Sequence, residues 1–99
     1  MQIQISGKQI EIGQALPEAV RSRFDGVVGK YFNGGGTAHV VFSHEGAFYR
    51  ADISVHLDAG AVIKAEGDAA DVHKAFDLAL DRLQAQIRRY MEKLKSHHG

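Results

Sequence analysis

The sequence predicts an α+β domain in the order β-α-β-β-β-α, with a four-stranded sheet and two helices packed on one of its faces. In two stretches, apolar residues recur every three or four positions, which is the spacing of a helix that buries one side. In four other stretches, apolar and polar residues alternate, as in strands with one face buried and the other in water. The 99 residues fit a single domain. We expect it to cover 1–95, followed by a disordered tail at 96–99.

The chain is expected to open with a short strand at residues 1–5, where two isoleucines share one side. A helix is then predicted from Gly13 to about Phe32. Its apolar stripe consists of Leu16, Val20, Phe24, Val27 and Tyr31. Pro17 falls near the first turn, where a missing amide costs least, and the Asn-Gly-Gly-Gly run at 33–36 ends the helix.

Three further strands are predicted at 37–44, 48–57 and 61–66. Short turns that contain glycine join them, as in antiparallel hairpins. In the middle one of these strands, polar residues take the solvent face: Arg50, Asp52, Ser54 and His56. We therefore expect both helices to cover the apolar face of the sheet and water to cover the other.

The longest predicted element is a closing helix from Asp68 to about Lys95. Asp68 is expected to be its N-cap, and Asp71 stands where a capping box would place an acid. The apolar stripe of this helix consists of Val72, Phe76, Ala79, Leu80, Leu83, Ile87, Tyr90 and Leu94. Because the stripe must pack on the sheet, polar residues are left on the two flanks of the helix.

Cations gather in the second half of the closing helix. From Arg82 to the C-terminus there are five cations and one acid, a local balance of +4, although the net charge of the chain is zero. At about 100° per residue, one flank carries Arg82, Arg89 and Lys93. The other flank carries Arg88 and Lys95.

The first helix carries Arg23 and Lys30 on one flank of its own stripe. If the two helices lie side by side, we expect these two residues to form one positive groove with Arg82, Arg89 and Lys93. Tyr31, Phe32 and Tyr90 would lie near it. Such a groove is typical of a protein that binds a phosphate backbone. The alternatives are a groove for an acidic protein partner and a basic helix face that is simply solvated.

The residues predict neither a catalytic nor a metal site. The chain has no cysteine, and its six histidines lack the spacing of zinc ligands. The glycine run is not followed by the Gly-Lys-Ser/Thr of a phosphate loop. Ser43, His44 and Glu45 are neighbours in a strand and therefore point to alternate faces. No apolar run is long enough to span a membrane and no signal peptide is apparent, so we expect a cytoplasmic protein without cofactor, metal or small-molecule substrate.

Four stretches together carry a resemblance that covers nearly the whole chain. They are MQIQISG at 1–7, IEIGQAL at 10–16, AEGD at 65–68 and FDLALDRLQAQIRRYMEKLK at 76–95. In this order they resemble the ribosome hibernation promoting factor family, also called ribosome-associated inhibitors or sigma-54 modulation proteins.

The resemblance implies a fold akin to the double-stranded RNA-binding domain and no catalysis. It implies binding to the 30S subunit and the 70S ribosome through 16S ribosomal RNA, in the channel for messenger RNA and transfer RNA anticodon arms. Translation would thereby be inhibited and idle ribosomes preserved. The basic residues that carry over are Arg23, Lys30, Arg82, Arg88, Arg89, Lys93 and Lys95. Long members dimerise through a C-terminal domain, so we expect this chain alone to be monomeric. The alternative is a structured-RNA or protein-interaction module not specific to ribosomes.

Overall fold

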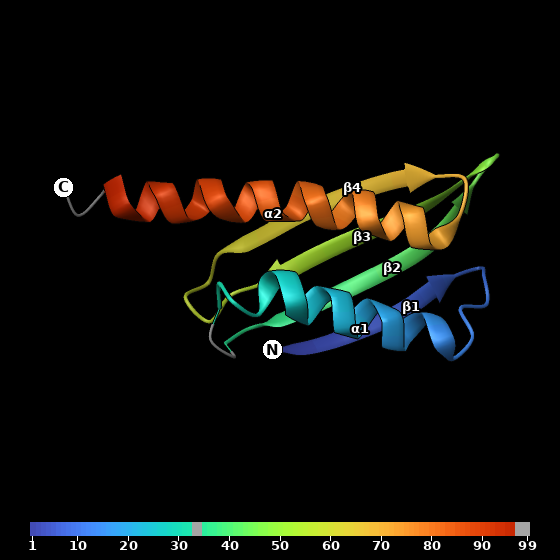
Figure 1. Cartoon of the computed structure of the whole chain (residues 1–99), viewed down its shortest axis with the longest axis horizontal. Helices are drawn as coiled ribbons and strands as arrows, with labels where there is room; N and C mark the ends of the chain where they lie inside the picture. Colours follow the sequence, from blue (N-terminus) through green and yellow to red (C-terminus); the bar gives the residue numbers. More distant parts are fainter. Residues whose placement is uncertain (33–34, 97–99) are drawn as a thin grey trace.

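The computed structural model describes residues 1–32 and 35–96 and has the predicted order of elements, so the predicted fold is confirmed. Figure 1 shows the chain. Its elements are β1 (Gln2–Lys8), α1 (Ala15–Val28), β2 (Thr37–Glu45), β3 (Phe48–His56), β4 (Val62–Ala69) and α2 (Val72–Ser96). Asn33 and Gly34 of the glycine run, and 97–99 of the predicted tail, lie outside the described residues.

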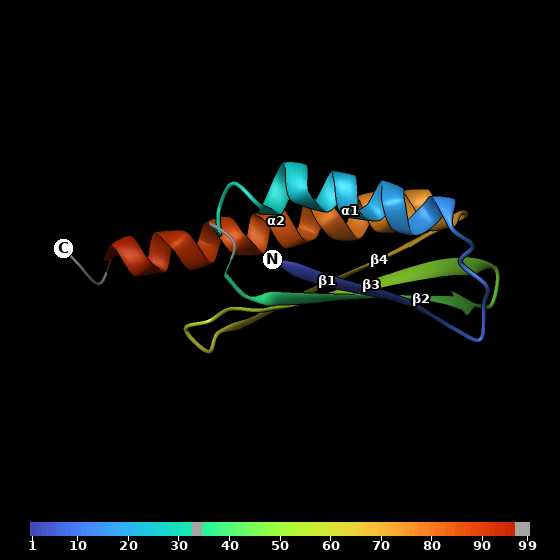
Figure 2. The same cartoon turned by 90° about the horizontal axis from the view of Figure 1, so that it is seen from below.

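The four strands form one sheet in the order β1-β2-β3-β4. β1 and β2 are parallel, because α1 carries the chain back across the sheet between them. β2, β3 and β4 follow as antiparallel neighbours. Both helices cover one face of the sheet and leave the other face open (Figure 2).

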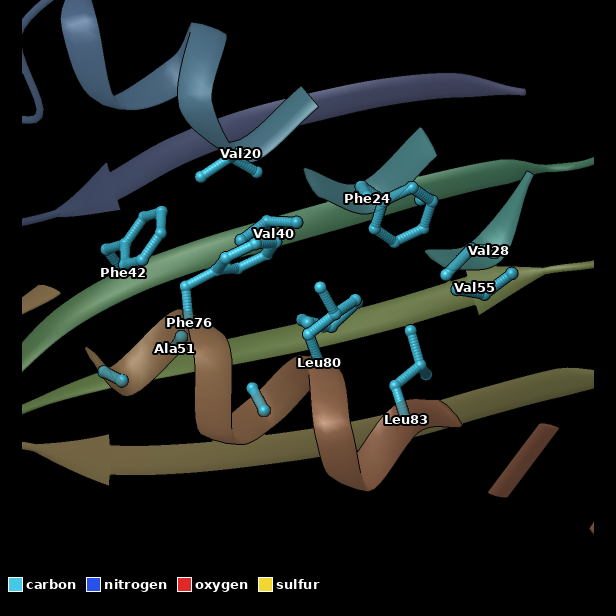
Figure 3. Close-up of a cluster of buried hydrophobic side chains, with 14 of the residues drawn as sticks. Val20, Phe24, Val28, Val40, Phe42, Ala51, Val55, Phe76, Leu80 and Leu83 are labelled. Carbon is cyan, nitrogen blue, oxygen red and sulfur yellow. The ribbon is translucent and has the colours of Figure 1, made fainter. Parts of the chain in front are cut away.

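The core lies between the two helices and the sheet (Figure 3). Val20 and Phe24 of α1 are buried there against β2 and β3. α2 contributes Phe76, Leu83 and other stripe residues, and the rings of Phe76 and Phe42 have centroids 6.3 Å apart. Buried apolar area of this kind is the main source of stability in a domain of this size. The core therefore fixes how α2 is rotated about its axis.

The ends of several elements differ from the prediction. β4 continues to Ala69, so Asp68 is a strand residue, and the prediction that it caps α2 is wrong. Its carboxylate instead accepts hydrogen bonds from Arg50 on the neighbouring strand. Asp71 is the cap, since its carboxylate accepts a bond from the backbone N–H of Lys74 at 2.9 Å. α1 ends at Val28, earlier than predicted, because Gly29 terminates it.

α2 packs very closely on β4. A Cβ atom at Gly67 would lie 2.6 Å from backbone atoms of both Ala75 and Ala79, so only glycine lets the helix approach to this distance. Past the sheet, α2 continues without cover (Figure 1). Leu94 was predicted to be buried in the stripe, but it is 41% exposed because the sheet does not reach it.

Across residues 1–32 and 35–96, none of the helices combines the length and the apolarity that crossing a bilayer requires.

Candidate nucleic-acid interface

Six of the seven predicted cations are on the helices, Lys30 lies in the turn just after α1, and all seven are exposed. The two flanks of α2 face different neighbours. One flank faces α1, and we call it the α1 flank. The other lies over the edge strand β4, and we call it the β4 flank. The predicted cations therefore divide into two groups that do not meet.

On the α1 flank, the cations contact other side chains of the same protein. Arg23 of α1 forms an ion pair with Asp77 of α2. The hydroxyl of Tyr31 accepts a hydrogen bond from the amide of Gln84, with 3.4 Å between the two atoms. Hydrogen bonds from Gln84 and Arg88 lower the pKa of Tyr31, because they favour the phenolate. The Nζ atom of Lys30 lies 5.5 Å from the centre of the Tyr31 ring. This flank thus carries a mixed set of charges and polar contacts.

On the β4 flank, cations gather around a shallow hollow of about 310 Å³. Arg89 and Lys93 reach it from α2, one turn apart, and Lys64 reaches it from β4. We call these three residues the basic ridge. Among the residues described, those that line this hollow include no acid. The ridge is therefore a local positive surface in a chain whose net charge is zero.

Sequence reasoning missed Lys64. It occupies an outward position in β4, and the packing of α2 against that strand places it in the lining of the same hollow as Arg89 and Lys93; it also lines a second hollow with Asp52 and Glu66. The sequence did contain an indication of it, because Lys64 alternates with Ile63 and Ala65 in the predicted strand and is therefore expected to have an exposed side chain.

Arg82 lies on the β4 flank, but its side chain is hydrogen-bonded within the protein. Its guanidinium donates a hydrogen bond to the backbone carbonyl of Glu66 at 2.9 Å, and Gln86 donates one to the carbonyl of Lys64 at 3.1 Å. β4 is an edge strand, so its outer carbonyls need partners. These two side chains of α2 supply them and cover part of that edge.

The prediction of one merged groove is therefore wrong. Arg23 contacts Asp77 on one side of α2, while Arg89 and Lys93 line a hollow with β4 on the other side. The physical reason is that α2 spans the gap between α1 and β4, so the helix itself separates its two flanks. Arg88 is the α2 cation that meets the α1 side, through Tyr31.

The open face of the sheet carries paired charges of both signs. Arg50 and Asp68 form a two-bond ion pair, with distances of 2.7 and 3.1 Å, and the hydrogen bonds lower the pKa of Asp68. Asp52 lies opposite Glu66 on the next strand. Burial raises the pKa of Asp52, and the charge of Glu66 adds to this effect. Such a surface does not favour a polyanion. In the part of the chain that the structure describes, no group of three acids or histidines could hold a metal ion.

Comparison with known proteins shows the family and the fold. The family described as sigma 54 modulation protein / S30EA ribosomal protein matches residues 3–95. A ribosome hibernation promotion factor of Rhizobium meliloti (strain 1021) is 39% identical over 99 residues, which are 100% of this chain and 52% of that protein. The ribosome hibernation promoting factor of Escherichia coli (strain K12) is 32% identical over 97 residues, 98% of this chain and 100% of that protein. The chain thus spans about half the length of the first relative and all of the second.

Solved structures share the fold. The N-terminal domain of Thermus thermophilus Protein Y superimposes with a TM-score of 0.79 at 34% identity, covering 91% of this chain and 99% of that one. A ribosomal subunit interface protein from Coxiella burnetii has the same fold, with a TM-score of 0.83 at 24% identity, covering 93% of this chain and 99% of that one.

The family match includes both helices and all four strands, so the resemblance found in the sequence is confirmed. The family is not an enzyme family, in agreement with the expectation from the sequence. This chain belongs to the sigma 54 modulation protein / S30EA ribosomal protein family.

Proposed function

We propose that this protein is a ribosome hibernation factor. It binds the small ribosomal subunit in the decoding channel, where messenger RNA and transfer RNA anticodon arms would lie, and it contacts 16S ribosomal RNA there. A body wedged in this channel excludes both RNAs, so translation stops and the idle ribosome is preserved in the cytoplasm. The names of the relatives from Rhizobium and Escherichia support hibernation as the function.

The basic ridge is the observation that carries the proposal. Its three cations come from two elements packed against each other, so the backbone positions that carry them are fixed before any partner arrives. Binding therefore does not have to order the backbone, as it would for cations on a disordered tail. Arg88, Lys30 and Lys95 add further exposed positive charge. Arg23 and Arg82, which are engaged within the protein, are expected to contribute less.

The geometry favours recognition of RNA shape over sequence. The ridge presents lysine and arginine side chains on a helix and an edge strand, without a row of amide side chains that would read base edges. Structured RNA is bound in this way, through its phosphates and overall form. Ribosomal RNA in the decoding channel offers many phosphates in a fixed arrangement.

Sedimentation of the purified chain with small subunits tests the proposal, with bulk transfer RNA as competitor. We expect the chain to pellet with the subunits and to remain there when transfer RNA is in excess by mass. Loss to the competitor would show a general RNA-binding module instead. A chain that stays in the supernatant with subunits alone would contradict RNA binding altogether.

The described surface also favours a monomer. α2 buries most of its apolar stripe on the sheet and exposes only its end around Leu94, and the open sheet face is too polar for an obligate dimer interface. We propose that this chain alone blocks ribosomes without pairing them, so sucrose gradients should show single 70S particles. A 100S peak formed by this chain alone would contradict that part of the proposal.

A further inference from the structure

An apolar hollow of about 360 Å³ lies where α2 extends past the sheet. It is lined by Tyr31, Phe32, Leu57, Tyr90, Met91 and Leu94, and we call it the aromatic hollow. The volume lies within the range of small-ligand pockets, about 300–1,000 Å³. Leu94 is one of the few large apolar side chains that the described part of the protein exposes. The hollow is therefore an apolar surface left open to solvent at a charged end of the molecule.

Aromatic rings make up much of this lining. Two of the three tyrosines of the chain are here, together with Phe32. Tyr31, Phe32 and Tyr90 are each only partly buried, so a flat group can reach them. Exposed rings of this kind serve as stacking surfaces for unpaired nucleobases.

Positive charge surrounds the hollow. Lys30 lies over the ring of Tyr31, and the nearby Arg88 contributes to lowering the pKa of its hydroxyl. Among the lining residues that the structure describes, Asp58 is the acid that a phosphate would have to avoid. Lys30 and Arg88 border the hollow through Tyr31, and both can attract a negatively charged ligand.

Tyr90 joins this hollow to the basic ridge. It lines the aromatic hollow together with Met91 and Leu94, and it also lines the ridge hollow with Arg89 and Lys93. An apolar peptide would fill the first hollow but leave the cations of the second without partners. A single strand of RNA matches both, because its phosphates and its bases project to different sides of one backbone.

We propose that the aromatic hollow binds an unpaired nucleobase of an RNA strand whose phosphates lie on the basic ridge. The base stacks against Tyr90 and packs among the apolar residues around it. This inference rests on the proposed RNA-binding function and adds to it a site for a base beside the site for phosphates. Because any base has a flat face, the site selects single-stranded or bulged RNA over a perfect duplex without selecting a sequence.

Two matched probes separate base binding from phosphate binding. One is an oligoadenylate of about 12 nucleotides, within the usual site size for single strands. The other is a backbone of the same length and charge without bases. Both carry the same fluorescent label, and fluorescence anisotropy gives their dissociation constants. We expect the wild-type chain to bind the oligoadenylate about 5- to 150-fold more tightly than the abasic backbone, as one stacked base provides.

Tyr90→Leu keeps the apolar volume but removes the ring. This variant should bind both probes equally, at the affinity of the wild type for the abasic backbone. Its salt dependence should be unchanged, because no phosphate contact is lost. Tyr90→Phe keeps the ring and should retain the preference. Thermal melting of each variant checks that the fold is intact.

The result that overturns the inference is equal binding of the two probes by the wild type, or a preference that survives in Tyr90→Leu. Either result would indicate that the aromatic hollow binds an apolar protein segment and not a base. Small-subunit sedimentation with the same samples keeps the two proposals apart. If the wild type pellets with subunits but does not distinguish the probes, only the base site is wrong. If it does not pellet, the proposed function fails as well.

Discussion

The two flanks of α2 have similar composition but different neighbours. On the α1 flank, Arg23 meets Asp77, and Tyr31 meets Gln84 and Arg88, so charged and polar groups are partnered within the protein. On the β4 flank, Arg89 and Lys93 meet a third cation, Lys64. One flank joins two elements of the fold, and the other carries the hollow whose described lining holds cations and no acid. The comparison shows that a cation's role is set by the element that its flank faces.

The energetics of the two flanks differ accordingly. The Arg23–Asp77 pair is about half exposed, and exposed pairs contribute only about 0–1 kcal/mol to stability. The hollow of the basic ridge has no such ion pair between α2 and β4 among its described lining residues, since these include no acid. Cations that gather on one exposed surface suit a partner of opposite charge.

Charge reversal on the ridge should have the largest effect. Arg89→Glu with Lys93→Glu should abolish co-sedimentation with small subunits, because two attractive phosphate contacts become repulsive. The melting temperature should change little, since both side chains are exposed. The matched control is Lys8→Glu with Lys74→Glu, the same change of charge at the last residue of β1 and in the first turn of α2. The end of β1 and the start of α2 lie at the opposite end of the molecule from the C-terminal part of α2 (Figure 1). Ridge variants that co-sediment as well as this control would show that the β4 flank does not bind ribosomes.

Leu83→Ala tests the rotation of α2, which decides where each flank lies. Leu83 is fully buried in the core, so its truncation should lower the free energy of unfolding by about 2–5 kcal/mol. Leu94→Ala, in the same stripe but past the sheet, should cost about 1 kcal/mol or less. Urea denaturation measures both. Equal costs for the two leucines would mean that the assigned rotation of the helix is incorrect.

Gly67→Ala tests the close contact that holds the β4 flank in place. The added Cβ atom would meet the backbone of Ala75 and Ala79, and overpacking of this kind costs about 1–3 kcal/mol. Gly26→Ala in α1 is the control, because nothing lies within 4 Å of the new atom. This change should stabilise the helix by about 0.4–1 kcal/mol. The two substitutions should therefore shift the urea midpoint in opposite directions, and shifts of the same sign would contradict the packing described.

The smallest effect is expected at Tyr31 on the α1 flank. Hydrogen bonds from Gln84 and Arg88 lower its pKa, because they stabilise the charged phenolate. Gln84→Leu removes the larger of these contributions, so the pKa of Tyr31 should rise. NMR titration of the ring at alkaline pH measures this change. An unaltered pKa in the variant would show that the two groups do not meet in solution.

Much of the fold could be predicted from the sequence, because periodicity reports directly which residues are buried. The order of elements, the solvent face of β3 and the core positions Phe76, Leu83 and Ile87 all follow from spacing alone. Periodicity does not report where an element ends. Asp68 looks like a helix cap in the sequence, but its carboxylate is bound by Arg50, a residue 18 positions away on the neighbouring strand.

The candidate site was predicted in part. Helical spacing separated Arg82, Arg89 and Lys93 from Arg88 correctly, since it depends only on the helix. It did not reveal which flank faces α1, because that depends on how the helix packs. Lys64 was missed for the same reason: it joins the ridge through tertiary contact between β4 and α2.

The salt dependence of small-subunit binding tests the central claim most directly. It is measured between about 50 and 200 mM salt, a range over which five phosphate contacts would cost about two to three decades of affinity. Arg89→Gln with Lys93→Gln removes two contacts, so the slope of log K against log salt should be shallower by about two than in the wild type. Lys8→Gln with Lys74→Gln, which removes the same charge far from the ridge, should leave the slope unchanged. A ridge variant whose slope equals that of the control would contradict the claim that these cations bind ribosomal RNA.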